Sequence, residues 1–126
     1  MNTAMNPKAI LICIAMAAPS AWADLKYGDY AAAGKDHPVV VGYMTGLVSG
    51  VHLANEAVLV ATGKDLFCLP QGIVITLDSA HSLVEGEAQK FEPASRKDLL
   101  IPPLLMKGVK SVYACAPANG TFIPRN

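Results

Sequence analysis

The sequence predicts a small all-α fold, a helical bundle of three to four helices stapled by one disulfide. Two long segments place apolar residues at steps of three and four, which is the spacing of one helix face. Pro38 and Pro102-Pro103 stand where a proline can open a helix. With residues 1–23 set aside as a signal peptide, residues 24–126 suffice for one domain with a thin core. We therefore expect a single all-α domain over residues 24–126 that ends in an irregular C-terminal tail.

Residues 1–23 have the layout of an export signal. Lys8 is the only charge, an apolar run follows, and Ala21-Trp22-Ala23 gives an A-x-A cleavage pattern. The apolar run has about ten residues, well short of the roughly 20 that a membrane-spanning helix needs. A lipid-anchored cysteine in this segment is disfavoured, because a bulky residue precedes it. We expect cleavage after Ala23 and a periplasmic mature protein.

The strongest helical pattern runs from Pro38 to about Ala61. Asp36 is the expected N-cap, and Gly63 is suited to ending the helix. The face predicted to be buried consists of residues three or four apart: Val40, Tyr43, Leu47, Val51, Ala54 and Val58. A short helix before Asp36 would be the fourth of the bundle.

Three glycines on this helix, Gly42, Gly46 and Gly50, follow one another at intervals of four. Each costs about 0.5–1 kcal/mol relative to alanine, so a close backbone contact is expected to offset them. We predict a helix-packing contact inside the domain, with a homodimer contact as the alternative. A membrane-spanning dimer helix shows the same pattern, but His52 and Glu56 argue against it because charge is costly within a bilayer.

Thr76 is the predicted cap of a second helix from Leu77 to about Phe91, which Pro93 ends. Its apolar face is Leu77, Ala80, His81, Val84, Ala88 and Phe91. Residues 93–101 form a predicted connection, and a last helix opens at the proline pair and ends near Cys115. The residues it is predicted to turn inward are Leu105, Val109, Val112 and Tyr113.

Two cysteines, Cys68 and Cys115, remain after signal cleavage. Disulfides persist in oxidising compartments and stabilise thin cores, so we expect the two to be joined. Such a bond ties the loop after the first long helix to the end of the last one. Closing a loop of about 47 residues is worth roughly 4 kcal/mol. The alternative is a nucleophilic cysteine paired with His37, His52 or His81, but neither cysteine lies in a recognisable nucleophile motif.

Charge and motifs exclude several function classes. Ten basic and ten acidic side chains balance in the whole chain, so no basic field exists to hold a nucleic acid. His52 and Glu56 share a helix face, but two ligands do not make a metal site. His81 is interpreted as a hydrogen-bonded histidine, and Glu85 and Glu87 as solvated. With no phosphate-binding loop, CxxC pair or G-x-S-x-G elbow, we expect no catalytic residue, cofactor or metal, and action by binding.

Three short motifs in their order resemble the Rap/Tai family of type VI secretion immunity proteins. They are Gly42-Tyr43-Met44-Thr45-Gly46, then Phe67-Cys68-Leu69-Pro70, then Tyr113-Ala114-Cys115. The resemblance covers roughly residues 28–115. The chain departs from the family pattern at Ser49-Gly50, where an acidic residue is usual, at Ala114, where a proline is usual, and in its Pro102-Pro103 pair.

The resemblance implies an exported all-α protein that neutralises a papain-like peptidoglycan amidase by covering its cleft. It also implies that the chain can form a homodimer. Residues 62–67 and 92–98 are candidate recognition loops because they are polar and adjoin helix ends. The alternative function is a small periplasmic chaperone or stress-protective helical protein, which would respond to acidification.

Overall fold

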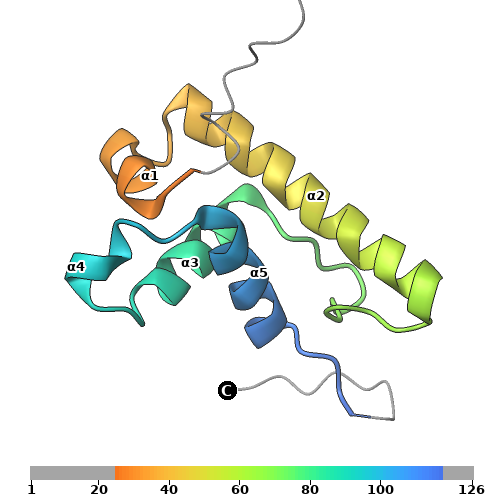
Figure 1. Ribbon diagram of the computed structural model, residues 1–126. Helices are drawn as coiled ribbons and strands as arrows, with labels where there is room; N and C mark the ends of the chain where they lie inside the picture. The colour runs from red at the N-terminus through yellow and green to blue at the C-terminus, as the bar shows by residue number, and fades with distance from the viewer. Residues whose placement is uncertain (1–24, 118–126) are drawn as a thin grey trace, which may run out of the picture.

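The computed structural model describes residues 25–117 of the chain, so the predicted signal peptide and most of the predicted tail lie outside the described residues. The described residues form five helices (Figure 1): α1 (Tyr27–Ala33), α2 (Pro38–Thr62), α3 (Leu77–Ala88), α4 (Pro93–Arg96) and α5 (Ile101–Val112). Within 25–117, extended pairing is confined to one isolated antiparallel bridge, between Lys26 and Leu100. The predicted all-α class is confirmed.

The longest helix, α2, begins and ends much as its sequence predicts, with a different N-cap. Pro38 stands in the first turn, and Gly63 ends the helix in the left-handed region with a φ of 71°. His37, and not the predicted Asp36, is the N-cap, because His37 holds the extended backbone just before the first turn. Its Nδ1 accepts the Val39 N–H at 3.3 Å.

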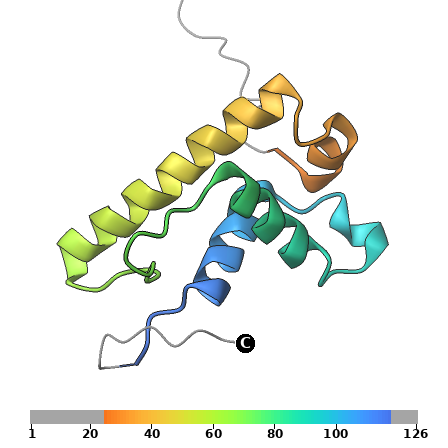
Figure 2. The same ribbon diagram turned by 180° about the vertical axis from the view of Figure 1, so that it is seen from behind.

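One face of α2 packs against the rest of the fold. Seen from both sides, α2 runs along one edge, and the other helices all lie on the same side of it (Figures 1 and 2). Its buried residues are Val40, Met44 and Val51, with Tyr43, Leu47 and Val48 partly buried beside them. The predicted face is thus largely confirmed, although the pattern did not include Met44, which is fully buried.

α3 and α5 pack against each other, and a glycine sets their separation. Their buried apolar residues are Ala80, Val84, Ala88, Ile101, Leu104, Leu105 and Val109. A Cβ added at Gly108 would lie 3.0 Å from the Leu83 Cβ and 3.1 Å from the Leu83 carbonyl oxygen. The two helices can approach this closely because Gly108 has no side chain.

α1 is attached at its start and at its middle. The Leu25 carbonyl accepts the Ile101 N–H at 3.0 Å, and the Tyr27 N–H donates to the Leu99 carbonyl at 2.7 Å. In the core, the Tyr30 hydroxyl and the Nδ1 of His81 are 2.7 Å apart and hydrogen-bonded. This short helix is the fourth that the sequence predicts before Asp36, and the interpretation of His81 as a hydrogen-bonded histidine is confirmed.

Three boundaries and positions differ from the prediction. α3 ends at Ala88 rather than Phe91, because the N–H groups of Lys90 and Phe91 donate to carbonyls three residues back, which tightens the chain into turns. The segment predicted as a connection contains the four-residue helix α4. Val112, predicted to face inward, is 53% exposed because the last turn of α5 runs past the other helices (Figure 1).

The predicted disulfide between Cys68 and Cys115 is confirmed. Next to it, Phe67 is almost fully buried, and the Cys68 N–H donates to the Tyr113 carbonyl at 2.8 Å. The bond therefore ties the loop after α2 to the end of α5, where a backbone contact already joins them. Because disulfides persist in oxidising compartments, this linkage is compatible with export.

The contact at Gly108 is expected to be intolerant of side chains. Gly108→Val should lower the free energy of unfolding by about 1–3 kcal/mol, because the added methyls overlap a backbone carbonyl that cannot move aside. Gly86→Val is the matched control, since a Cβ there meets nothing within 4 Å, and it should change stability by less than about 0.5 kcal/mol. Urea denaturation measures both. Equal losses for the two variants would contradict the close approach of α3 and α5.

Tyr30 makes the fold sensitive to alkaline pH. Burial, with the Glu85 carboxylate and Tyr27 nearby, raises the pKa of Tyr30 to about 12 from 10.0. Because the pKa of Tyr30 is higher in the folded than in the unfolded protein, the stability that its protonated hydroxyl contributes is fully present below pH 10. This contribution is lost as the pH rises towards 12, and the free energy of unfolding falls by about 1 kcal/mol between pH 9 and 11. Tyr30→Phe should be less stable at pH 9 but show a weaker decline with pH. A parallel decline in both proteins, measured by urea denaturation, would assign the sensitivity elsewhere.

Candidate interaction surface

The face of α2 that points away from the core is uncovered along its length. It comprises residues that recur at steps of three and four: Val39, Gly42, Gly46, Gly50, Leu53, Ala57 and Val60. We call these seven residues the outer face of α2. All of them are exposed. Leu53 is 65% and Val60 is 88% exposed, so these large side chains find no cover within the described chain.

The outer face offers few free polar groups to solvent. Thr45 and Ser49 border it, but their hydroxyls donate back to the helix, to the Val41 carbonyl at 2.7 Å and the Thr45 carbonyl at 3.1 Å. Glu56 is the sole Asp, Glu, Lys or Arg residue of the whole helix, and His52 is its sole histidine. This uncharged stripe of apolar side chains and glycines is unfavourable to expose to water. Such a surface is suited to contact with another molecule.

The predicted internal contact of the glycine stripe is wrong for the described chain. A Cβ at Gly42, Gly46 or Gly50 would meet no atom of a neighbouring element within 4 Å. The residues one and two positions after each stripe glycine lie about half a turn around the helix from it. These following residues form the buried face of α2. The alternative that was left open, a contact with another molecule, remains a proposal.

Comparison with known proteins adds no guide to the site. No family model, curated protein or solved structure matches the chain. The function of the surface therefore has to be argued from its own geometry.

The loop that follows the C-terminal end of α2 is fixed by side-chain hydrogen bonds. The Asn55 Oδ1 accepts the N–H groups of Leu66 at 2.7 Å and of Phe67 at 3.1 Å, while its Nδ2 donates to the Asp65 carboxylate at 3.0 Å. Residues 62–65 are exposed, whereas Phe67 is anchored in the core. This predicted recognition loop thus presents a fixed polar edge next to the end of α2.

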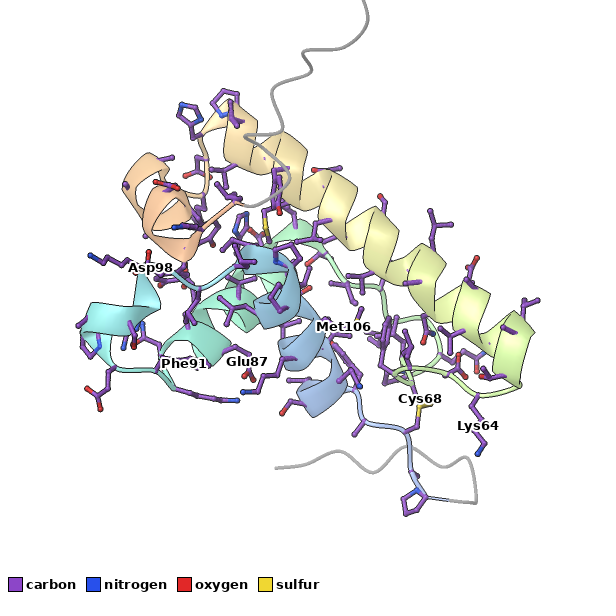
Figure 3. The ribbon with its side chains drawn as sticks, viewed as in Figure 1. Lys64, Cys68, Glu87, Phe91, Asp98 and Met106 are labelled. Atoms are coloured by element: carbon purple, nitrogen blue, oxygen red, sulfur yellow. A yellow bond between two sulfur atoms is a disulfide. The ribbon has the colours of Figure 1, made fainter. Side chains whose placement is uncertain are left out.

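The second predicted recognition loop, residues 92–98, is held by polar contacts of its own. The Arg96 Nη2 donates to the Phe91 carbonyl at 2.9 Å, and Lys26 pairs with Asp98 at 3.4 Å. It lies at the opposite end of the molecule from the loop of residues 62–67, where Asp98 and Lys64 mark the two ends (Figure 3). The two loops therefore do not form one continuous surface.

The interpretation of Glu87 as a solvated side chain is wrong. Glu87 is 3% exposed, and its carboxylate is paired with Lys90 and with Lys107, whose Nζ lies 3.7 Å from Oε2. The Lys107 Nζ also lies over the Phe91 ring, 5.4 Å from its centroid. The sequence could not reveal this burial, because it follows from the approach of α5 at Gly108, which covers the Glu87 stem.

The remaining predicted residues are not brought together into a chemical site. His52 is partly buried and Glu56 is exposed on α2. Within residues 25–117, no three His, Cys, Asp or Glu side chains come close enough to hold a metal ion. His81 is buried with Tyr30, and its ring lies 5.6 Å from the tyrosine ring. The hydrogen-bond partner Tyr30 was not predicted, because it precedes His81 by 51 positions.

α2 is also the one helix of the described residues that is long and apolar enough to cross a membrane by length and composition. Core helices of other proteins meet the same test, but α2 is mostly unburied.

The sequence contained the signal for the outer face of α2, since Val39, Leu53 and Val60 are apolar residues that fall outside the predicted inner face. Counting the apolar residues on both faces of the helix would have found it.

Replacing the stripe glycines with alanine tests whether they pack within the chain. Gly42→Ala and Gly46→Ala should each raise the free energy of unfolding by about 0.5–1 kcal/mol, because alanine loses less backbone entropy in a helix and meets no neighbour here. Thermal denaturation of the monomer at low concentration measures the effect. If both substitutions destabilised the protein, the glycines would have to pack against another element of the same chain.

Proposed function

We propose that this protein is an exported, periplasmic immunity protein that binds and occludes a peptidoglycan amidase effector of a type VI secretion system. The order of the three motifs around Gly42, Cys68 and Cys115 supports the family, and the disulfide is compatible with an oxidising compartment. The observation that carries the proposal is the uncovered outer face of α2.

The outer face has the properties of a protein-binding surface. Burying a leucine or valine side chain is worth about 1.5–3 kcal/mol, and Leu53 and Val60 are both available for it. The three glycines let a partner's backbone or side chains approach the helix axis closely. The helix is straight in both views and 25 residues long, or about 37 Å at 1.5 Å per residue, so it presents this surface as a rigid rod (Figures 1 and 2).

Occlusion follows from shape and needs no chemistry by this chain. A papain-like amidase places its cysteine and histidine in a cleft that an extended peptide must enter. A convex helix laid across the mouth of that cleft, with the fixed loop of residues 62–65 beside it, excludes the substrate peptide. No residue of the immunity protein has to touch the nucleophile.

Substitutions on the outer face should weaken binding of the effector without unfolding the protein. Gly46→Leu and Leu53→Asp are expected to weaken binding of the effector about 10- to 100-fold, because the first blocks close approach and the second places a charge in an apolar contact. The partner to test is any small Cys-His amidase found in a reading frame next to this gene. Isothermal titration calorimetry gives the affinity, and hydrolysis of peptidoglycan peptides gives the inhibition.

Val74→Asp is the matched control, because Val74 is 66% exposed but lies in the loop before α3. It should leave affinity and inhibition unchanged. An amidase that the wild-type protein neither binds nor inhibits would refute the proposed function. Binding of many unrelated unfolded proteins, strengthened by acidification, would favour the chaperone. Loss of self-association alone in Gly46→Leu would make a second copy of the chain the occupant of this face.

A further inference from the structure

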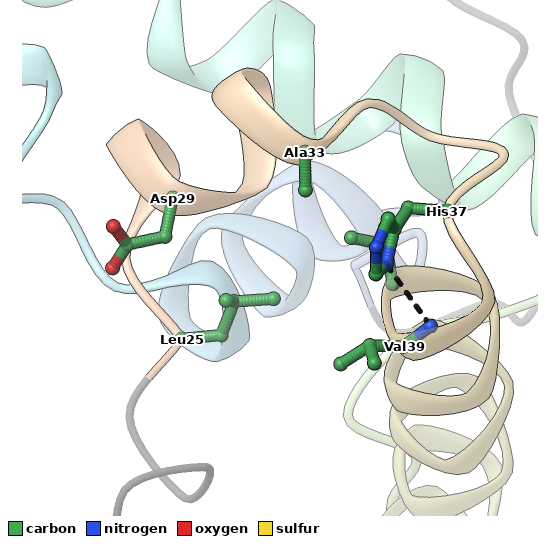
Figure 4. Close-up of a pocket in the computed structure, with 6 residues that line it drawn as sticks. Leu25, Asp29, Ala33, His37 and Val39 are labelled. Atoms are coloured by element: carbon green, nitrogen blue, oxygen red, sulfur yellow. Dashed lines mark hydrogen bonds between the residues drawn. The ribbon is translucent and has the colours of Figure 1, made fainter.

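A pocket opens between α1 and the first turn of α2, and nothing in the proposed function uses it. Its volume is about 180 Å³, and its lining residues are Leu25, Asp29, Ala33, His37, Val39 and Val40 (Figure 4). Val39 belongs both to this pocket and to the outer face of α2. The pocket is therefore the N-terminal end of the same surface, where that surface turns from a ridge into a hollow.

The inside of the pocket is almost entirely carbon. Leu25 and Val40, which are nearly fully buried, form its floor, while Ala33 and Val39 stand at the surface beside it. An apolar cavity of about 150 Å³ in another protein stays dry and binds benzene. A pocket of about 180 Å³ can accordingly take one leucine or phenylalanine side chain.

The charge at the edge of the pocket is negative. Asp29 lies at one end and His37 at the other (Figure 4). Within residues 25–117, the Asp29 carboxylate has no hydrogen bond or ion pair, in contrast to Asp98, which pairs with Lys26. The His37 Nδ1 accepts the Val39 N–H at 3.3 Å, so this nitrogen is not available to pair with Asp29. A positive group beside the apolar one would therefore find an unpaired partner in Asp29.

We infer that this pocket is the socket for an anchor residue of the protein partner, a leucine- or phenylalanine-sized side chain with a basic residue next to it in sequence. The apolar side chain fills the hollow between α1 and α2, and the neighbouring cation pairs with Asp29. Buried anchors of this kind carry most of the binding energy at protein interfaces. The inference deepens the proposed function, on which it rests for a protein as the source of the side chain.

Three blocked peptides test the socket without any effector: Gly-Phe-Lys, Gly-Phe-Glu and Gly-Ala-Lys. Each is titrated into the mature, disulfide-bonded protein, and the methyl resonances of Leu25, Val39 and Val40 are followed by NMR. Gly-Phe-Lys should shift these methyls saturably and bind at least tenfold more tightly than Gly-Ala-Lys, because only the first fills the hollow. Gly-Phe-Glu should bind several-fold more weakly than Gly-Phe-Lys, and Asp29→Asn should remove that preference.

Ala33→Leu fills the pocket from its exposed wall and should abolish the methyl shifts. Ala94→Leu, at an exposed position on α4, is the matched control and should retain them. If Ala33→Leu does not fold, Val39→Met serves the same purpose, because Val39 is 40% exposed and also lines the pocket. The absence of saturable shifts with Gly-Phe-Lys, or their persistence in the filled variant, would overturn the socket. Equal binding of the lysine and glutamate peptides would overturn the role of Asp29. Each of these results leaves the amidase test on the outer face intact, so the two proposals fail separately.

Discussion

The close approach of α3 and α5 at Gly108 is the constraint on which the rest of the packing depends. With a Cβ at this position only 3.0 Å from Leu83, any other residue would push the helices apart. The apolar side chains of Val84, Leu105 and Val109 are fully buried at this separation. α1 then docks on α3 through Tyr30 and His81, and the disulfide fixes the far end of α5 to the loop after α2.

α2 contributes to that core with one face only. The unfavourable free energy of its opposite face is therefore not offset by contacts within the described chain. Its three stripe glycines cost about 0.5–1 kcal/mol each relative to alanine, and no contact among the described residues offsets them. Its large apolar side chains on the same stripe stay in water. A partner that covered this face would bury the apolar side chains, and its close contact at the glycines would offset their entropic cost, which is the physical reason for proposing a binding surface here.

The buried polar groups have structural explanations. The hydroxyl of Tyr30 and the imidazole of His81 satisfy each other in the core, where an unpaired polar group would cost about 1–3 kcal/mol. Glu87 is held at the α3–α5 contact by two lysines whose side chains are more than half exposed. Such a pair is costly to break but is weak evidence of stability or of catalysis. The Tyr30–His81 and Glu87–Lys107 contacts each join two helices.

The sequence by itself determined the helical class, the three long helices, the cap at Thr76, the end of α2 at Gly63 and the pairing of Cys68 with Cys115. These features depend on local periodicity, on backbone preferences and on the number of cysteines, all of which can be read along the chain. It did not determine which glycine makes the close contact, because Gly42, Gly46 and Gly50 have the spacing of a packing stripe, whereas Gly108 stands alone.

Only the tertiary structure decided the burial of Glu87, the partner of His81 and the exposure of the outer face of α2. Each depends on which helix faces which, and therefore on contacts between residues far apart in sequence. The hollow between α1 and α2 has the same origin, since Leu25 and Val40 meet only when the two helices fold back on each other. The helix pattern shows which stripes are apolar, but the packing of the other helices decides which stripe is buried and which stays exposed.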